Sequence, residues 1–249
     1  MAPRNPSRRT ARGVPDESAL KRIATRRVSH HDESRSLAEV ACDEIRRAIR
    51  EGRIPTGAHL AEVDIAAWLG MSRTPVREAM RRLQSEGLLL TQPFRGALVM
   101  RLDAEDMRQM FAVRELLEPA AASACALQAT ATEMQAMREV LLREADVLDN
   151  PSALIPLNRQ FHDLILDAAH NQFLGKAIAA VYSLIPLLGD SNLLDEPHAR
   201  AAHAQHQAIL SAIESRDAVR AEAIAREHVK HSLEHRLARI GGHARSPRD

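Results

Sequence analysis

The sequence contains few of the residues on which several classes of protein depend. Aromatic residues make up only 2% of its 249 residues, which disfavours binding to nucleic acid by stacking bases on exposed rings. The two cysteines, Cys42 and Cys125, lie far apart, so we expect no disulfide framework and a cytoplasmic location. No apolar run approaches the roughly 18 residues that a membrane helix needs. Because no such run follows the arginine-rich N-terminus either, the sequence predicts neither a membrane span nor a secretory signal.

Charge of the two signs is unevenly distributed along the chain, although the net charge is only +1. Residues 1–101 carry 19 Lys and Arg against 12 Asp and Glu, whereas residues 102–249 carry 15 against 21. A basic half joined to an acidic half indicates that only the first half contacts a polyanion such as double-stranded DNA. Solvated surface charge is the alternative, and charge counts alone do not separate the two interpretations.

The hydrophobic pattern divides the chain into four parts. Residues 1–35 are rich in Pro, Arg and Ser without hydrophobic periodicity, and we expect a mobile basic arm there. Residues 36–102 predict a winged helix-turn-helix domain, and residues 103–241 predict an all-helical domain. Residues 242–249 form a short tail.

Three helices followed by a β-hairpin make up the predicted winged helix-turn-helix. Ser36 begins the first helix with a capping-box sequence, and the helical spacing of apolar residues continues to Ile49. Glycine ends each of the three helices. The second and third helices are expected at residues 62–69 and 72–86. The two strands of the hairpin are expected at residues 88–92 and 97–101.

The second half of the chain predicts helices alone. They are expected at residues 103–127, 130–148, 152–169, 172–189, 197–215 and 217–240. Pro119 and Pro186 lie inside two of these segments and are expected to kink or break them. The fold class is therefore mainly α, with an N-terminal winged helix-turn-helix and a C-terminal all-α helical bundle long enough to have its own core.

The helix expected at residues 72–86 has a positively charged face apart from its apolar stripe. Arg73, Arg77 and Arg81 recur every four residues on that face. Free amide groups at a helix N-terminus attract phosphate, and arginine can hold guanine O6 and N7 with two hydrogen bonds. The pattern favours a recognition helix that enters the major groove of DNA. An arginine-rich surface helix is the alternative.

The run SRTPVREAMRRLQSEGLL, followed by an Arg-Gly pair in the hairpin, closely resembles the GntR superfamily of bacterial transcription regulators over about residues 36–101. The resemblance implies that the first arginines of the helix contact the operator, and that the glycine lets the wing tip approach the minor groove. Some relatives carry a DNA-contacting arginine after the glutamate that matches Glu62, whereas this chain has Val63, so operator preference is expected to differ. The candidate DNA-binding residues are Arg73, Thr74, Arg77, Arg81, Arg95 and Gly96.

Nine of the twelve histidines lie in the acidic half. Asn158 and His162 are four residues apart and share one face of a predicted helix, beside an apolar stripe. His206 and His228 lie on the inward faces of two later helices. Three imidazoles and one side-chain oxygen from three helices suit a divalent metal such as zinc, with nickel or manganese as alternatives. For each histidine alone, a hydrogen-bonded core or surface residue is the competing interpretation.

The same four residues resemble the ligand pattern of the FCD-type effector domain in the FadR-like branch of the GntR superfamily. Asn158 and His162 match in NRQFH, His206 matches in HQAILSAI and His228 matches in AREHV. Many relatives carry aspartate in place of Asn158, and a neutral amide oxygen is a weaker ligand than a carboxylate. The combination of NxxFH with AHxQHxAxL is most similar to the vanillate-responsive branch.

An enzyme with a catalytic zinc ion is a competing interpretation of the histidines. Catalysis would need a general acid or base over an open metal position, and the sequence contains no H-E-x-x-H, G-x-S-x-G or Gly-rich phosphate loop. We therefore predict that the protein is not an enzyme and that the metal anchors a ligand. A DNA-packaging protein without an effector is a second alternative. His203 and His231 have suitable spacing but are expected to lie outside the ligand set.

Together these patterns predict a homodimeric repressor that binds a palindromic DNA operator. A small carboxylate, such as an aromatic acid, is expected to bind at the metal site and release the repressor, with a coupling free energy of about 1–3 kcal/mol. Arg114 is the candidate residue for holding the carboxylate of this effector. An ion pair between Arg114 and Glu118, one helical turn later, is the alternative.

Overall fold

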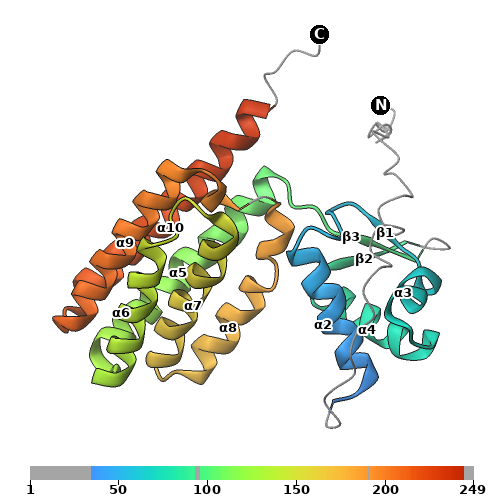
Figure 1. Ribbon diagram of the computed structural model, residues 1–249, viewed down its shortest axis with the longest axis horizontal. Helices are drawn as coiled ribbons and strands as arrows, with labels where there is room; N and C mark the ends of the chain where they lie inside the picture. Colours follow the sequence, from blue (N-terminus) through green and yellow to red (C-terminus); the bar gives the residue numbers. More distant parts are fainter. Residues whose placement is uncertain (1–34, 93–95, 190, 244–249) are drawn as a thin grey trace, which may run out of the picture. The chain divides into compact units, whose positions relative to one another are not determined.

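The computed structural model describes residues 35–92, 96–189 and 191–243. The chain divides into two compact units, residues 1–100 and residues 101–249 (Figure 1). The predicted basic arm, apart from its last residue, lies outside the described residues, as does Arg95. Across the described ranges, no helix has an apolar stretch of the length that a bilayer requires.

The first unit combines three helices with a small antiparallel sheet. Its elements are α2 (Leu37–Arg50), β1 (His59–Leu60), α3 (Glu62–Leu69), α4 (Arg73–Ser85), β2 (Leu89–Gln92) and β3 (Gly96–Val99). The strand order is β1-β3-β2, and Leu90 pairs with Leu98 in the β2–β3 hairpin. This is the predicted winged helix-turn-helix, with the short strand β1 added at the edge of the hairpin.

Local capping and an apolar core explain why these helices form. The side chain of Ser36 accepts a hydrogen bond from the Glu39 amide, and the Glu39 carboxylate accepts one from the Ser36 amide, which completes the predicted capping box. Gly70 ends α3 in the left-handed conformation. The largest fully buried side chains of the unit come from α2, α3, α4, the strands and the connecting segments: Ile45, Ile54, Leu60, Ile65, Leu83, Leu88 and Leu89.

Gly96 has a structural role that the sequence analysis did not anticipate. Its φ is +85°, and a Cβ atom placed on it would lie only 2.3 Å from the carbonyl oxygen of Leu60. Strand β1 was not predicted, because two residues are too short to show the alternation of a strand. Glycine at position 96 therefore allows β3 to begin close to the end of β1, whatever else it contributes at the wing.

The second unit is an all-helical bundle. Its α-helices are α5 (Ala104–Gln128), α6 (Ala131–Ala145), α7 (Pro151–Ala168), α8 (Gln172–Tyr182), α9 (Glu196–Glu214) and α10 (Ala218–His243). Two short 3₁₀ helices, η1 (Ile185–Leu188) and η2 (Asn192–Leu194), connect α8 to α9. Helix α5 packs against α7, α8, α9 and α10 (Figure 1). The main apolar core contains residues from α5 through α10, with Met137 and Phe161 fully buried.

The two prolines predicted to disturb helices behave differently. Of the two outcomes predicted for Pro119, a kink or a break, the structure excludes the break, because α5 continues through it to Gln128. Pro119 is buried on this helix, and a single missing amide hydrogen bond is tolerated there. The helix predicted over residues 172–189 ends at Tyr182, and Pro186 lies in the first turn of η1. A 3₁₀ turn accommodates proline at its start, where no amide donor is needed.

We predict that Gly96→Ala destabilises the first unit more than Gly57→Ala does. Gly57 also has a positive φ, of +80°, but a Cβ atom there would meet nothing within 4 Å. The control substitution, Gly57→Ala, should lower the free energy of unfolding by about 1–2 kcal/mol through backbone strain alone. For Gly96→Ala, crowding against the Leu60 carbonyl should lower the free energy of unfolding by about 1–3 kcal/mol more. Urea unfolding can be followed by the fluorescence of Trp68, the single tryptophan, which lies on α3. Equal losses in the two variants would contradict the role of the close approach.

Candidate nucleic-acid interface and metal centre

Helix α4 separates its apolar and charged residues as predicted. Val76, Ala79, Met80 and Leu83 are buried. The residues predicted to contact DNA from this helix are all exposed: Arg73, Thr74, Arg77 and Arg81. The apolar side fixes the helix on its unit, and the opposite side offers three guanidinium groups to a partner.

Glu62 on α3 holds the two arginines nearest the N-terminus of α4. Its Oε2 accepts a hydrogen bond from Nη2 of Arg73 at 3.2 Å and lies 3.5 Å from Nε of Arg77. The arginine side chains remain 61% and 48% exposed. The carboxylate therefore links the two helices of the helix-turn-helix and restricts where both guanidinium groups can lie. Val63, the next residue, is 56% exposed.

The N-terminus of α4 has no side-chain cap. Ser72 occupies the N-cap position in extended backbone conformation, but its hydroxyl accepts no hydrogen bond from the helix. The first amide groups of α4 are left for an external acceptor, such as a phosphate oxygen. Gly96 begins β3 on the wing hairpin.

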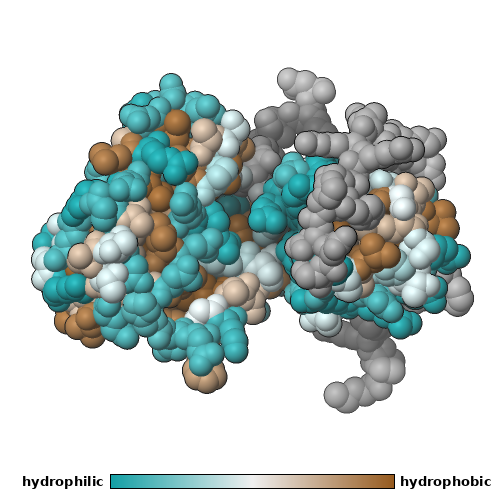
Figure 2. Space-filling view, turned by 60° about the horizontal axis from the view of Figure 1, so that its bottom comes forward, coloured by the Kyte–Doolittle hydropathy of each residue, from teal (hydrophilic) through white to brown (hydrophobic). Residues whose placement is uncertain are grey.

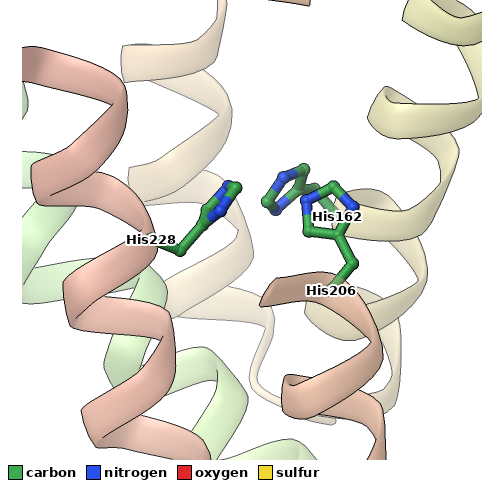
Figure 3. Close-up of side chains that lie close together, drawn as sticks. All are labelled: His162, His206 and His228. Carbon is green, nitrogen blue, oxygen red and sulfur yellow. The ribbon is translucent and has the colours of Figure 1, made fainter. Parts of the chain in front are cut away.

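In the second unit, three of the predicted ligands come together. His162 on α7, His206 on α9 and His228 on α10 offer nitrogen atoms that all lie within 4.8 Å of one another. Figure 3 shows the three rings turned towards a common centre from three helices. The ring centroids of His206 and His228 are 4.8 Å apart, and those of His162 and His206 are 5.0 Å apart. Residues separated by up to 66 positions in sequence thus converge at one point.

Asn158 also reaches this cluster, but through its nitrogen. Its Nδ2 lies 3.4 Å from Nε2 of His206. An amide binds a metal ion through oxygen, so Asn158 would act as a ligand only after its side-chain amide turned to present Oδ1. Its place beside the three histidines agrees with the predicted ligand set, and its role as a ligand stays a prediction.

Two acceptors outside the predicted set hold the histidine rings. Oε2 of the buried Glu144 lies 3.2 Å from Nδ1 of His206 and 3.1 Å from Nδ1 of His203. Oε1 of Gln205 accepts a hydrogen bond from Nδ1 of His228 at 2.9 Å. In both rings the Nδ1 atom is engaged, so Nε2 is the atom available to the cluster. His203 lies outside the cluster of three, as predicted.

The donor atoms suit a divalent metal ion. Burial, reinforced by the nearby His206 ring, holds the pKa values of His162 and His228 well below the usual value for histidine. Both imidazoles are therefore neutral near pH 7, which is the form that binds metal. Three imidazole nitrogen donors from separate helices match the ligands that zinc and nickel take in proteins. Among the described residues, no other group of three or more His, Cys, Asp and Glu side chains comes together in this way.

A pocket adjoins the histidine cluster. His162 and His228 line it together with Glu118, Tyr182 and apolar side chains such as Ile209. Burial and the nearby Glu118 carboxylate raise the pKa of Tyr182 well above its usual value, so its hydroxyl stays protonated. The pocket therefore offers an apolar wall, a hydroxyl group and the imidazole rings to a small ligand.

Arg114 lies on α5 and forms the ion pair that was the alternative to effector binding. Its Nε donates to Oε1 of Glu118 at 2.6 Å, and its Nη2 lies 3.4 Å from Oε2. Its guanidinium group stacks over the ring of Phe111, 4.4 Å from the centroid. The structure thus pairs Arg114 with a residue that lines the pocket, and a contact between Arg114 and an effector stays a prediction.

A winged helix-turn-helix with an exposed arginine face, joined to a separate helical unit, defines a class of DNA-binding protein. Comparisons with known proteins agree with this class. The family model described as bacterial regulatory proteins, gntR family, matches residues 37–99, and the FCD domain model matches residues 109–231. The chain belongs to the GntR family of bacterial transcription regulators, with an N-terminal GntR helix-turn-helix domain and a C-terminal FCD domain.

Relatives and a solved structure extend along most of the chain. The chain is 31% identical over 200 residues to the probable D-xylose utilization operon transcriptional repressor of Paenarthrobacter nicotinovorans, covering 78% of this chain and 86% of the relative. It is 30% identical over 188 residues to the Nta operon transcriptional regulator of Aminobacter aminovorans, covering 75% and 88%. Its fold is similar to that of McbR/YncC from Escherichia coli, with a TM-score of 0.71 and 20% identity over 83% of this chain and 99% of that one.

These relationships decide between two of the classes considered from the sequence. The protein is a transcription regulator and not an enzyme, since its domains and its relatives are those of regulators. The predicted class, the fold and DNA as a partner are confirmed. None of the relatives described above is named as a vanillate-responsive regulator, so the predicted similarity to that branch is not confirmed.

We predict that Glu62→Gln lowers the ratio of operator affinity to non-operator affinity. The substitution removes the carboxylate that restrains Arg73 and Arg77, so both arginines should contact phosphate more freely and base edges less often. The free energy of unfolding should change by less than about 1 kcal/mol, because the pairs are exposed.

Asp64→Asn is the matched control, because Asp64 is an exposed acid on the same helix. It removes the same charge without touching the arginines. Fluorescence anisotropy with operator and scrambled DNA gives both affinities. If the two variants changed the affinity ratio equally, the effect would be one of charge alone.

Proposed function

We propose that this GntR-family regulator is a homodimeric repressor whose FCD domain binds a divalent metal ion and a small carboxylate effector. The observation that carries the proposal is the convergence of His162, His206 and His228 beside a pocket. Effector binding there would change how the two DNA-binding domains of the dimer are spaced. A coupling free energy of about 1–3 kcal/mol would suffice to release the operator.

The DNA-binding half of the proposal rests on α4. Arg73, Thr74 and Arg77 are exposed at the end of the helix whose amide groups have no side-chain cap. Amide groups and one arginine can hold phosphate, while another arginine reads guanine in the major groove. Arg81 extends the same face by one turn. Arg95 and Gly96 belong to the wing and are proposed to contact the adjacent minor groove.

A dimer is supported by exposed apolar side chains on α5. Leu116 and Leu127 are each 68% exposed and lie on one side of the helix, with Val113 nearby at 41%. Figure 2 shows hydrophobic residues, in brown, among hydrophilic ones on the visible face of the helical unit. A two-fold dimer would cover such residues and would match the symmetry of a palindromic operator.

The metal half of the proposal follows from the chemistry of the donors. Three imidazoles and the amide of Asn158 would bring no negative charge to a bound divalent ion. An anionic ligand is the natural complement of such a site. Zinc is the proposed ion, with nickel and manganese as alternatives. The ion, when bound, would supply a positive centre for the carboxylate of the effector.

The chain's own residues would shape the effector's remaining contacts. A small aromatic acid is the effector that the resemblance to the vanillate-responsive branch suggests, and the apolar side chains and Tyr182 that line the pocket would face its ring. Arg114 could contact a carboxylate only by sharing its guanidinium group with Glu118. A DNA-binding protein without an effector is the remaining alternative, and it would leave the pocket and the histidine cluster without a role.

We predict that Arg77→Ala abolishes specific operator binding while the fold and the dimer persist. Loss of a two-bond contact to guanine should cost about 1–3 kcal/mol of binding free energy. Arg82→Ala is the control, since Arg82 lies on the same helix but pairs with Glu86 through its Nε at 3.2 Å. A mobility-shift titration with the operator measures both. Unchanged operator affinity for Arg77→Ala would remove Arg77 from the interface.

We predict that the purified protein holds about one divalent ion per chain and that His206→Ala loses it. The ion would connect α7, α9 and α10, so its loss should lower the melting temperature and weaken the effector response. His203→Ala should keep the ion, because His203 lies outside the cluster of three. Elemental analysis and melting curves test both variants. Loss of metal from His203→Ala but not from His206→Ala would show the ligand assignment to be wrong.

A further inference from the structure

Glu144 is a buried carboxylate in contact with two histidine rings. It lies on α6 and is only 1% exposed. Within the part of the chain that the structure describes, its ion-pair partners are two imidazoles, those of His203 and His206. Its Oε1 atom is buried and has no hydrogen-bond partner. A carboxylate removed from water requires hydrogen bonds or a nearby positive charge, so the position of Glu144 calls for an explanation.

The geometry around Glu144 fixes the orientation of one predicted ligand. A carboxylate can only accept hydrogen bonds, so Nδ1 of His206 carries the proton across the 3.2 Å contact. The opposite atom, Nε2, then has its lone pair free, and it lies on the side of Asn158, His162 and His228. Glu144 therefore selects both the tautomer and the ring orientation that a metal ligand at this position needs.

The charges of the site complete the argument. The three histidines and Asn158 bring no negative charge to a divalent ion, and Glu144 is the buried acid in contact with one of the histidines. A hydrogen-bonded carboxylate raises the basicity of the imidazole that it contacts, and it partly balances the charge of an ion bound on the other side of the ring. The buried carboxylate and the neutral donor set are thus complementary.

We propose that Glu144 is a positioning residue that strengthens metal binding through His206 and supplies the negative charge that the neutral donors lack. This inference rests on the metal site of the proposed function. His203 has a supporting role, because its Nδ1 donates to the same Oε2 atom at 3.1 Å and so holds the carboxylate towards α9. The ion itself stays with the cluster of three histidines.

The test compares Glu144→Gln with Glu139→Gln in the full-length protein. Glutamine keeps the shape of Glu144 and removes its charge. Glu139 is an exposed acid on the same helix, hydrogen-bonded to Gln135. Zinc affinity is measured by competition with a chelator, and melting temperature is measured with and without zinc.

Glu144→Gln should bind zinc about 10–100-fold more weakly than the wild-type protein, while Glu139→Gln should bind it equally well. The rise in melting temperature on adding zinc should shrink in Glu144→Gln. The zinc-free melting temperature of this variant should change little, because the glutamine oxygen can still accept a hydrogen bond from a histidine Nδ1 atom. If Glu144 had a merely structural role, the melting temperature would fall by the same amount with and without zinc.

A measurement on the wild-type protein avoids any dependence on how the variant folds. With ¹⁵N-labelled histidine and ¹¹³Cd in place of zinc, His206 should show coupling of cadmium to Nε2 and a proton retained on Nδ1. Coupling to Nδ1 of His206 would overturn the proposal, as would equal zinc affinity of Glu144→Gln and wild type. If wild-type protein bound neither ion, the metal site of the proposed function would fall, and this inference with it.

Discussion

The helical unit has to accommodate polar side chains in the middle of an apolar bundle. His203, His206, His228 and Glu144 are all buried, where an unpaired polar group is unfavourable. Hydrogen bonds within the group make the arrangement tolerable, since Glu144 and Gln205 each hold the Nδ1 atom of a histidine. This group, with the His162 ring beside it, comes from four helices: α6, α7, α9 and α10. Its contacts therefore restrict how these helices can pack.

The DNA-binding unit has to be stable while its charged side chains stay exposed. Its function needs charged side chains that stay exposed, so they cannot stabilise the unit much. Stability comes instead from the apolar side of α4 and from close backbone contact between β1 and Gly96. Glu62 keeps two exposed arginines in place without burying them. A rigid apolar base thus carries a charged surface whose side chains remain available to DNA.

Much of this arrangement could be predicted from the sequence, and the reasons differ by element. Helices with caps and glycine stops, such as α2 and α3, were predicted to within a residue, because those signals are local. His162, His206 and His228 were chosen by helical facing and family resemblance, and the structure brings them together. Residues that depend on long-range packing were missed, as with β1 and the role of Gly96.

Glu144 was not predicted from the sequence as part of the site. It continues the buried positions Met137 and Leu141 of α6 at helical spacing, so a charged residue stood in an apolar stripe and could have been noticed. Its partner His206 is 62 residues away in sequence, however, and nothing local identifies that partner. For Arg114, the sequence left two partners open, an effector carboxylate and Glu118. The structure shows the pair with Glu118, four residues away.

The uneven anchoring of the three rings has a consequence for the rate at which an ion is captured. The His206 and His228 rings are held through Nδ1 before any ion arrives. No hydrogen bond to the His162 ring is recorded among the described residues, and this ring is the least buried of the three. An arriving ion would therefore meet two preset donors, and their side chains would lose little conformational entropy on binding it. His162 would close last on capture and open first on release, so this one side chain would govern how long the ion stays.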